Sequence, residues 1–175
     1  MKKITIVDYG SGNVLSAQKS FIKIAKDNNI EVEVLISKKL NDVKNSTHIV
    51  LPGQGAFSTC MNGLKKTDGL IDELSEFALI KKKPFLGICV GMQMLAKKSE
   101  ENGDHEGLGW IDGQIKLLPG DNLKLPHMGW NLAIPTNSKY NNLISNKNDY
   151  YFVHSYYFDC ANTVSYTHLR AHETP

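Results

Sequence analysis

The sequence predicts an α/β fold: a doubly wound, mostly parallel sheet flanked by helices, with additional antiparallel strands in the second half. Two observations support this prediction. As far as residue 98, short apolar segments alternate with segments of helical spacing, which is typical of parallel sheets with crossover helices. After Gly103, strand-like segments follow one another through polar loops, and the sequence contains no internal repeat.

Turn residues mark the boundaries of the expected elements. Apolar or alternating runs that end at turn residues predict strands over residues 4–7, 32–36, 48–51 and 84–89. Apolar residues at helical spacing predict helices over residues 13–28, 70–80 and 92–98. In the second half, strands are expected over residues 110–118, 129–134 and 150–158.

Length and composition limit the class of protein. The 175 residues fit one domain of ordinary size, which we expect over residues 1–163, and 41% hydrophobic with 22% charged residues is typical of a globular protein. A net charge of +2 excludes a strongly basic nucleic-acid binder. No apolar run approaches the ~18 residues that span a membrane. Three irregularly spaced cysteines argue against a disulfide framework, so a reducing, cytoplasmic location is expected.

Residues 164–175 differ in composition from the rest of the chain. They contain the one arginine, Arg170, and two of the six histidines, whereas every other basic residue is a lysine. They show neither strand alternation nor a helical stripe. We therefore expect a non-native tail, such as a cloning or sequencing scar, on a domain that is incomplete at its C-terminus. A frayed native terminus is the alternative interpretation.

Cys89 is the candidate nucleophile, because it stands in the segment Gly87-Ile88-Cys89-Val90-Gly91 between a predicted strand and a predicted helix. Flanking glycines permit the sharp elbow turn that presents a nucleophile at the carboxyl edge of a sheet. The start of a helix also favours the thiolate, which is the reactive form. A buried structural cysteine is the alternative interpretation.

The loop after the third predicted strand, with the sequence LPGQGAF over residues 51–57, is the candidate partner of this elbow. A backbone N–H at Gly53 together with the Val90 N–H would form an oxyanion hole, and Gly53 and Gly55 permit a peptide of the loop to rotate. A plain turn is the alternative interpretation. Residues 8–13 lack a nucleotide-binding fingerprint, and the other cysteines and the histidines lack ligand spacing, so we expect no nucleotide, metal or other cofactor.

Five motifs in the right order resemble those of class I glutamine amidotransferases, and among them the glutaminase subunits of imidazole glycerol phosphate synthases. The resemblance covers roughly residues 3–162, and its motifs are GICVGMQ (87–93), DYGSGN (8–13), LPGQGAF (51–57), PHMGWN (126–131) and YFVHSY (151–156). Each motif alone is weak, but their order makes the resemblance specific. It implies a flavodoxin-like sheet and a catalytic cysteine.

The resemblance implies that Cys89 attacks the side-chain amide of glutamine, that ammonia leaves, and that the glutamyl thioester is hydrolysed to glutamate. Gln93 and the segment His154-Ser155-Tyr156 would bind the amino-acid end of glutamine. Ammonia would pass to a (β/α)8 barrel cyclase subunit of a heterodimer that makes imidazole glycerol phosphate in histidine biosynthesis. Trp130 and Tyr151 would lie near the ammonia exit and the partner surface, with core packing as the alternative for both.

The catalytic triad is where the sequence departs from this family. Its members carry a His-Pro-Glu motif near the C-terminus, whose histidine is the general base, and this sequence contains no such motif. The most similar segment, His172-Glu173-Thr174-Pro175, has no proline between the histidine and the glutamate, and it lies in the expected tail. No triad role is therefore assigned to it. We expect the 175-residue chain to be inactive, because loss of a triad member typically costs ~10⁴-fold or more in rate.

Three other interpretations stay open. The chain could be a paralogous glutaminase subunit that supplies another synthase, for example one that amidates a surface sugar. It could be a non-catalytic subunit that docks on its partner and gates it, in which case the missing His-Pro-Glu motif would be native. A hydrolase or chaperone with a cysteine elbow is the third interpretation, but nothing in such a protein requires the PHMGWN motif.

Overall fold

A four-stranded parallel sheet forms the centre of the molecule, in the computed structural model that describes residues 1–120, 124–135, 148–160 and 169–171. Its strands lie in the order β2-β1-β3-β4 and are β1 (Lys2–Val7), β2 (Val32–Ser37), β3 (His48–Gly53) and β4 (Phe85–Cys89). All pairings are parallel, so the carboxyl ends of the four strands meet at one edge. The predicted α/β class is confirmed, and Gly53 and Cys89 end two adjacent strands at that edge.

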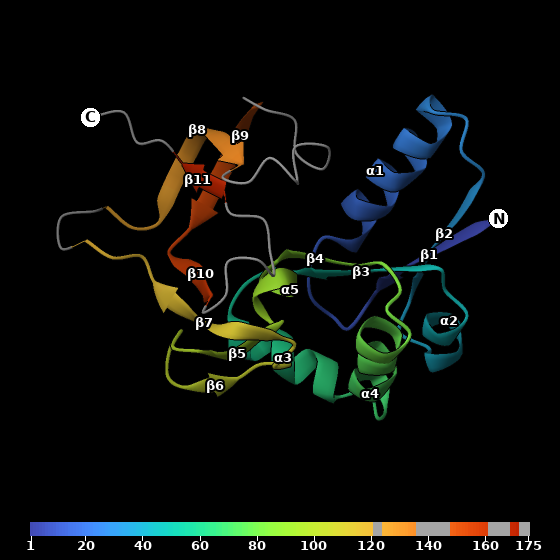
Figure 1. The fold of residues 1–175 in the computed structure, drawn as a ribbon, viewed down its shortest axis with the longest axis horizontal. Helices are drawn as coiled ribbons and strands as arrows, with labels where there is room; N and C mark the ends of the chain where they lie inside the picture. Colours follow the sequence, from blue (N-terminus) through green and yellow to red (C-terminus); the bar gives the residue numbers. More distant parts are fainter. Residues whose placement is uncertain (121–123, 136–147, 161–168, 172–175) are drawn as a thin grey trace.

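Helices cover both faces of the parallel sheet (Figure 1). On one face lies α1 (Val14–Asp27), the helix predicted over residues 13–28, and the Asn13 side chain caps it by accepting a hydrogen bond from the Ser16 N–H. The other face carries α2 (Leu40–Lys44), α3 (Phe57–Lys65) and α4 (Leu70–Ser75). Helix α4 continues as a π-helical turn, η1 (Glu76–Ile80), so the predicted segment 70–80 is helical along its whole length.

The main core lies on the α2–α3–α4 face of the parallel sheet. Its fully buried large side chains come from the sheet and from all three helices, and they include Val7, Val43, Ile49, Leu51, Phe57, Leu64, Leu70, Leu74 and Phe77. The α1 face is less well covered, because Ala25 is the one residue of α1 that is buried. A shallow apolar groove of about 190 Å³ remains there, beside Phe21 and the start of β4.

The predicted helix over residues 92–98 is wrong. Helix α5 (Val90–Gln93) ends after four residues, and the chain then forms strand β5 (Ala96–Ser99). The physical reason is tertiary pairing: β5 lies between β6 (His105–Glu106) and β7 (Ile111–Leu117) in a second sheet, and it buries Ala96 and Ser99 there. Strand pairing with partners later in the sequence outweighs the local helical pattern.

The segment 150–158, predicted as one strand, forms two. Strand β9 (Asn148–His154) pairs antiparallel with β8 (His127–Pro135), whereas β10 (Tyr156–Cys160) pairs antiparallel with β7 in the second sheet. The chain changes sheets at Ser155, which lies in a bend. A short strand, β11 (Leu169–Ala171), pairs with β8 and belongs to the segment expected to be a tail, whose other residues lie outside the described part of the chain.

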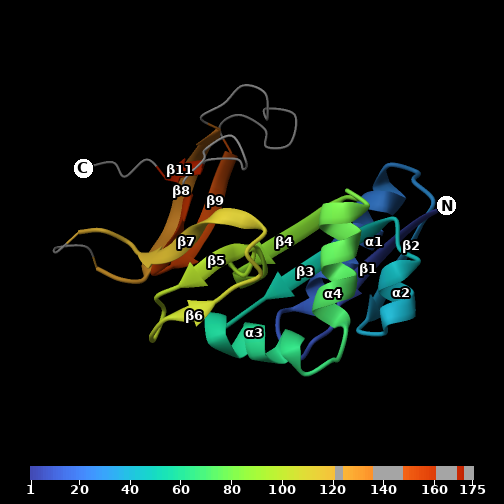
Figure 2. The ribbon, with the colours of Figure 1, turned by 60° about the horizontal axis from the view of Figure 1, so that its bottom comes forward.

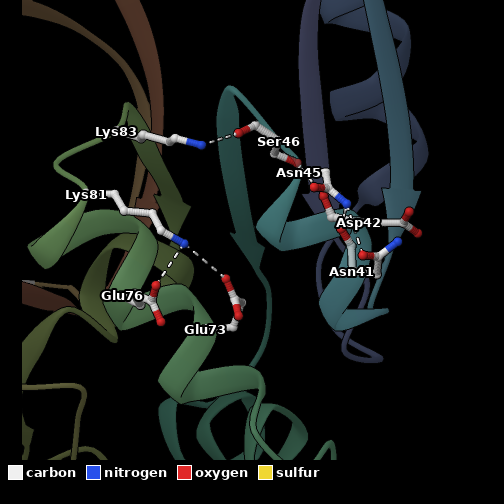
Figure 3. A network of polar contacts seen from close by, with 8 residues as sticks. All are labelled: Asn41, Asp42, Asn45, Ser46, Glu73, Glu76, Lys81 and Lys83. Atoms are coloured by element: carbon white, nitrogen blue, oxygen red, sulfur yellow. Dashed lines mark hydrogen bonds and ion pairs between the residues drawn. The ribbon is translucent and has the colours of Figure 1, made fainter.

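Lysines at the end of the α4–η1 segment make polar contacts near the amino-terminal edge of the parallel sheet, opposite the edge that holds Cys89. The Lys83 ammonium donates a hydrogen bond to the Ser46 carbonyl oxygen at 3.0 Å, and Lys81 pairs with Glu76 at 2.9 Å and with Glu73 at 3.7 Å (Figure 3). Salt bridges of this kind, which are partly open to water, contribute little to stability. Within the described ranges, no helix is long and apolar enough to cross a bilayer.

Candidate active site

Cys89 lies at the tip of a strained turn between β4 and α5. Its backbone has φ +55° and ψ −122°, a conformation that non-glycine residues rarely adopt and that is concentrated at functional sites. The residue is exposed, whereas Val90 and Gly91 directly after it are buried. Only four helical residues follow, so the helix-start argument for a thiolate is weaker than the sequence suggested.

Glycines let the elbow lie directly against the neighbouring strand. A Cβ atom on Gly91 would overlap the Leu51 carbonyl oxygen of β3, and one on Gly87 would lie 2.6 Å from the Met92 Cα. Both of these atoms belong to the backbone, so they cannot rotate away from an added side chain. The glycines that the sequence pattern emphasised are therefore needed for close packing, and this packing holds Cys89 beside the end of β3.

A cavity of about 380 Å³ opens at this edge of the sheet. It contains six of the predicted site residues: Cys89, Val90, Gln93, His154, Ser155 and Tyr156. The fold brings them together because β4 ends there and because the chain bends at Ser155 between two sheets (Figure 2). Among the described residues, Gly53, Trp130 and Tyr151 do not line this cavity.

The carbonyl oxygen of Tyr156 holds two of the cavity side chains in place. The His154 Nδ1 donates to it at 3.0 Å, and the Gln93 side-chain amide donates to it at 3.5 Å. Because a carbonyl oxygen only accepts, Nδ1 of His154 must carry hydrogen, which leaves Nε2 as the acceptor in the neutral ring. The two side chains are thus oriented by backbone on β10.

A one-way chain of hydrogen bonds continues from His154 along β8. The Asn131 amide donates to His127 Nε2 at 2.7 Å, so His127 carries its hydrogen on Nδ1 when neutral. That Nδ1 lies 3.4 Å from His154 Nε2 and can donate to it. Both nitrogens of His154 are therefore engaged by protein groups, and its imidazole is not directed to take a proton from Cys89.

Sequence reasoning missed Glu101, which lines the cavity together with Gln54, Gly55, Pro126 and Val153. One carboxylate oxygen of Glu101 accepts a hydrogen bond from the Phe57 N–H at 2.8 Å and so caps the start of α3. Among the described residues, no hydrogen bond is found for the other carboxylate oxygen. Glu101 lies two residues after the end of β5, and the mistaken helix over residues 92–98 gave no reason to place it near Cys89.

The side chains of Tyr9 and Ser11 hold the loop over residues 52–55 by hydrogen bonds. The buried Tyr9 hydroxyl donates to the Pro52 carbonyl oxygen at 2.6 Å, and burial raises the pKa of this phenol well above its ordinary value. The Ser11 hydroxyl donates to the Gln54 carbonyl oxygen at 2.8 Å and accepts from the Gln54 N–H at 3.3 Å. Cys60 lies 3.2 Å from the Ser11 oxygen and is completely buried.

Trp130 and Tyr151 lie on the β8–β9 hairpin. They are cross-strand partners whose rings meet edge to face at 5.6 Å, and their exposed fractions are 71% and 52%. The neighbouring cross-strand pair, Met128 and Val153, is also exposed, so four apolar side chains share one face of the hairpin. Such a patch marks an interaction surface more often than a folding core. Core packing, the alternative raised for these residues, does not describe their positions here.

No metal site forms within the described part of the chain, where His, Cys, Asp and Glu side chains do not gather in groups of three. The three cysteines form no disulfide with one another. The reactive and hydrogen-bonding groups at the cavity include the thiol of Cys89, backbone amides, Gln93 and Glu101. A thiol beside amide donors and a carboxylate is suited to acyl transfer from a small amino acid or amide.

Comparison with known proteins points to one family. The family Glutamine amidotransferase class-I matches residues 5–173. Imidazole glycerol phosphate synthase subunit HisH of Pelagibacter ubique is 46% identical over 158 residues, which cover 89% of this chain and 74% of that protein. The HisH subunit of Rhodospirillum rubrum is 42% identical over 161 residues, which cover 89% of this chain and 75% of that protein. HisH 1 of Campylobacter jejuni is 43% identical over 159 residues, with 90% and 76% covered.

A solved structure agrees on the fold. The crystal structure of a glutamine amidotransferase superposes with a TM-score of 0.62 and covers 89% of this chain and 72% of that one. Its sequence identity is only 14%, so this likeness supports the architecture and not the chemistry. The architecture it supports is the helix-flanked parallel sheet with antiparallel strands in the second half.

Proposed function

The chain belongs to the class I glutamine amidotransferase family, and we propose that it is the glutaminase subunit of imidazole glycerol phosphate synthase, acting in histidine biosynthesis. The observation that supports this most strongly is the cavity in which Cys89 meets Gln93 and residues 154–156. Relatives named as HisH subunits are 39–46% identical over about nine tenths of the chain.

The reaction follows from the elbow. The sulfur of Cys89 attacks the amide carbon of glutamine, the tetrahedral intermediate collapses, and the amide nitrogen leaves as ammonia after it gains a proton. Water then adds to the glutamyl thioester, and glutamate leaves as the thiol is restored. The Val90 N–H and the loop at Gly53 stabilise the oxyanion in both steps.

The cavity also supports recognition of the amino-acid end of glutamine. Gln93 and the backbone and side chains of residues 154–156 supply hydrogen-bonding groups, because β10 and the bend at Ser155 pass beside Cys89. Glu101 adds a carboxylate, which complements the positive α-ammonium group of glutamine. The cavity volume of about 380 Å³ lies in the range of small-molecule sites.

The oxyanion hole is incomplete in the observed state of the loop. The Gln54 N–H donates to Ser11, and Ser11 is not one of the described residues that line the cavity. In a planar trans peptide, the Gly53 carbonyl oxygen points in the direction opposite to the Gln54 N–H. Rotation of the peptide between Gly53 and Gln54 would turn an N–H toward the site. This requirement supports low activity of the isolated subunit and activation by a partner.

The partner in this proposal is a (β/α)8 barrel cyclase that receives the ammonia and forms a heterodimer with this chain. The relatives are named as subunits, and the exposed patch around Trp130 and Tyr151 supports an interface on the β8–β9 hairpin. The ammonia would exit near these two aromatic residues. A cytoplasmic location is part of the same proposal and is supported by the absence of a disulfide among the three cysteines.

The 175-residue chain itself is proposed to be inactive, since its sequence has no His-Pro-Glu motif and His154 is engaged on both nitrogens. Glutamine hydrolysis by this chain, with and without the cyclase subunit and its ligand, tests the proposal against a version that carries a native HisH C-terminus. We expect cyclase-stimulated ammonia release only from the latter. If the cyclase stimulates ammonia release from neither chain, the result would favour a non-catalytic subunit that gates its partner. The missing His-Pro-Glu motif is the observation that supports this second function.

A further inference from the structure

Two side chains beneath the loop over residues 52–55 hold different peptides of it. Tyr9 bonds the carbonyl oxygen of Pro52, which belongs to the peptide before Gly53. Ser11 bonds the N–H of Gln54, which belongs to the peptide after Gly53, and the carbonyl oxygen of Gln54 one peptide further on. A rotation of the Gly53–Gln54 peptide alone would break one Ser11 bond and leave the Tyr9 bond intact.

The Tyr9 ring is built into the fold as a fixed support. It is only 6% exposed, and it lies against Gly63 of α3, where an added Cβ atom would come within 2.9 Å of the ring. Its hydroxyl makes a short, 2.6 Å hydrogen bond to Pro52. A phenol on a rigid ring loses little freedom when it holds a backbone atom, so Tyr9 can keep Pro52 in place while the next peptide moves.

Ser11 has a different place in the network. Its single hydrogen is donated to the Gln54 carbonyl oxygen, and its oxygen receives the Gln54 N–H. The Cys60 thiol lies within hydrogen-bonding distance of both the Ser11 oxygen and the Gln54 carbonyl oxygen. The two Ser11 hydrogen bonds favour the observed orientation, in which the Gln54 N–H points to Ser11. Loss of the Ser11 hydroxyl would free that N–H.

Resting on the proposed function, we propose that Tyr9 is a positioning residue of the oxyanion loop: it anchors Pro52 so that the Gly53–Gln54 peptide can rotate by itself and present its N–H at a defined place beside Cys89. Ser11 opposes this rotation. The two side chains therefore have opposite effects on the same step, which a purely structural role of either would not produce.

The test uses a chloroketone analogue of glutamine, 2-amino-4-oxo-5-chloropentanoic acid, on the 175-residue chain. The Cys89 sulfur forms a bond to C5 as the carbon–chlorine bond breaks, chloride leaves, and the thiol proton passes to the buffer. Polarisation of the ketone oxygen by an oxyanion hole speeds this reaction, and no general base from the C-terminus is needed. Iodoacetamide, which has no such requirement, measures the intrinsic reactivity of the same thiol.

The readout is the ratio of the chloroketone rate to the iodoacetamide rate at Cys89. We expect Tyr9→Phe to lower it at least tenfold, because a missing oxyanion donor costs about 10²–10³ in rate and a misplaced one part of that. Ser11→Ala should raise the ratio. Thr5→Val is the matched control, since Thr5 is a fully buried residue whose hydroxyl bonds Ser46 at 2.6 Å near the opposite edge of the sheet.

Replacement of Tyr9 by 4-aminophenylalanine, which keeps a donor, should restore the ratio, and 4-fluorophenylalanine, which fills the space without one, should not. This pair gives the same comparison if Tyr9→Phe fails to fold. An unchanged ratio in the donor-free variants, or an equal fall in Thr5→Val, would overturn the role of Tyr9. If glutamine fails to protect wild-type Cys89 from the chloroketone, the proposed function itself is wrong and this role is lost with it.

Discussion

The turn at Cys89 combines a strained backbone with glycines two residues away on either side. The positive φ of Cys89 turns the thiol outward, and Gly91 allows the turn to lie against the Leu51 carbonyl of β3. Such strain costs about 1–3 kcal/mol and persists only where the surrounding packing enforces it. The completely buried residues Leu51 and Met94 belong to the same core cluster as Val90, directly after Cys89.

The proton on Tyr9 gives a pH dependence that can be assigned to one residue. Burial raises its pKa in the folded state above the value near 10 of an unfolded chain, so the stability it contributes is complete below about pH 10 and is lost as the pH rises further. Tyr9→Phe cannot ionise. We expect the difference in free energy of unfolding between wild type and Tyr9→Phe to shrink above about pH 10, as measured by urea titration.

A constant difference between the two proteins across this pH range would show that the phenol ionises equally well in the folded chain. All other ionisable groups are present in both proteins, so their contributions cancel in the difference. The measurement therefore isolates the hydroxyl that bonds Pro52.

Elements were predicted well where local pattern and tertiary packing agree. Strands β1 to β4 and helix α1 have strong apolar patterns and turn residues at their ends, and the structure has them within a few residues. The error at β5 shows the limit, because residues 96–99 take their conformation from β6 and β7, which follow later in the sequence. Pairing of this kind is not encoded in any local spacing.

The same limit applies to the site. The motif GICVGMQ pointed to Cys89 because an elbow is a local structure, and the segment 154–156 was placed near it through a family resemblance. Glu101 was missed because its place depends on β5. Both hydroxyls beneath the loop, of Tyr9 and Ser11, were also missed, since their partners are more than forty residues away.

Glu101 joins helix α3 to the cavity, and two substitutions separate its roles. Glu101→Gln keeps an oxygen that accepts from the Phe57 N–H but removes the charge, whereas Glu101→Ala removes both. We expect Glu101→Gln to keep wild-type stability and to raise the half-saturating concentration of the glutamine chloroketone about tenfold, the equivalent of ~1.4 kcal/mol. Glu101→Ala should also lose about 0.5–2 kcal/mol of stability, as for other lost helix caps.

Saturation kinetics of Cys89 labelling and urea denaturation provide these two quantities. If Glu101→Gln has the same half-saturating concentration of the chloroketone as wild type, the carboxylate does not contact the ammonium group of the ligand. Equal stability of Glu101→Ala and wild type would mean that the start of α3 does not depend on this cap.

At the scale of the whole molecule, the cavity is a junction of three sheets. The parallel sheet supplies Cys89, the second sheet supplies Tyr156 of β10, and the β8–β9 hairpin supplies His154. Val153 belongs both to the cavity lining and to the exposed apolar face of the hairpin. The hairpin therefore connects the reaction site to the surface proposed for the partner.

Trp130 gives a test of that surface. Because its side chain is 71% exposed, Trp130→Ala should change the free energy of unfolding by no more than about 0.5 kcal/mol. If the patch docks a cyclase subunit, the same change should weaken the complex by about 2 kcal/mol or more, as at other aromatic hot spots. Leu15→Ala, at a 60% exposed position on α1, is the control and should leave the complex unchanged.

Isothermal titration of the cyclase subunit into each variant measures these affinities. If Trp130→Ala and Leu15→Ala bind the cyclase as tightly as wild type, the hairpin face is not the interface. Tyr151→Ala then offers an independent check, because it removes the cross-strand ring that packs on Trp130.

The central claim is that Cys89 is a nucleophile that recognises glutamine, and its most direct test is the identity of the labelled cysteine. The chain is treated with the glutamine chloroketone, digested, and analysed by peptide mass spectrometry, with and without excess glutamine. We predict modification of Cys89 alone, with protection by glutamine, while the buried Cys60 and the half-buried Cys160 are spared. Equal modification of the three cysteines, or labelling that glutamine does not slow, would contradict the account.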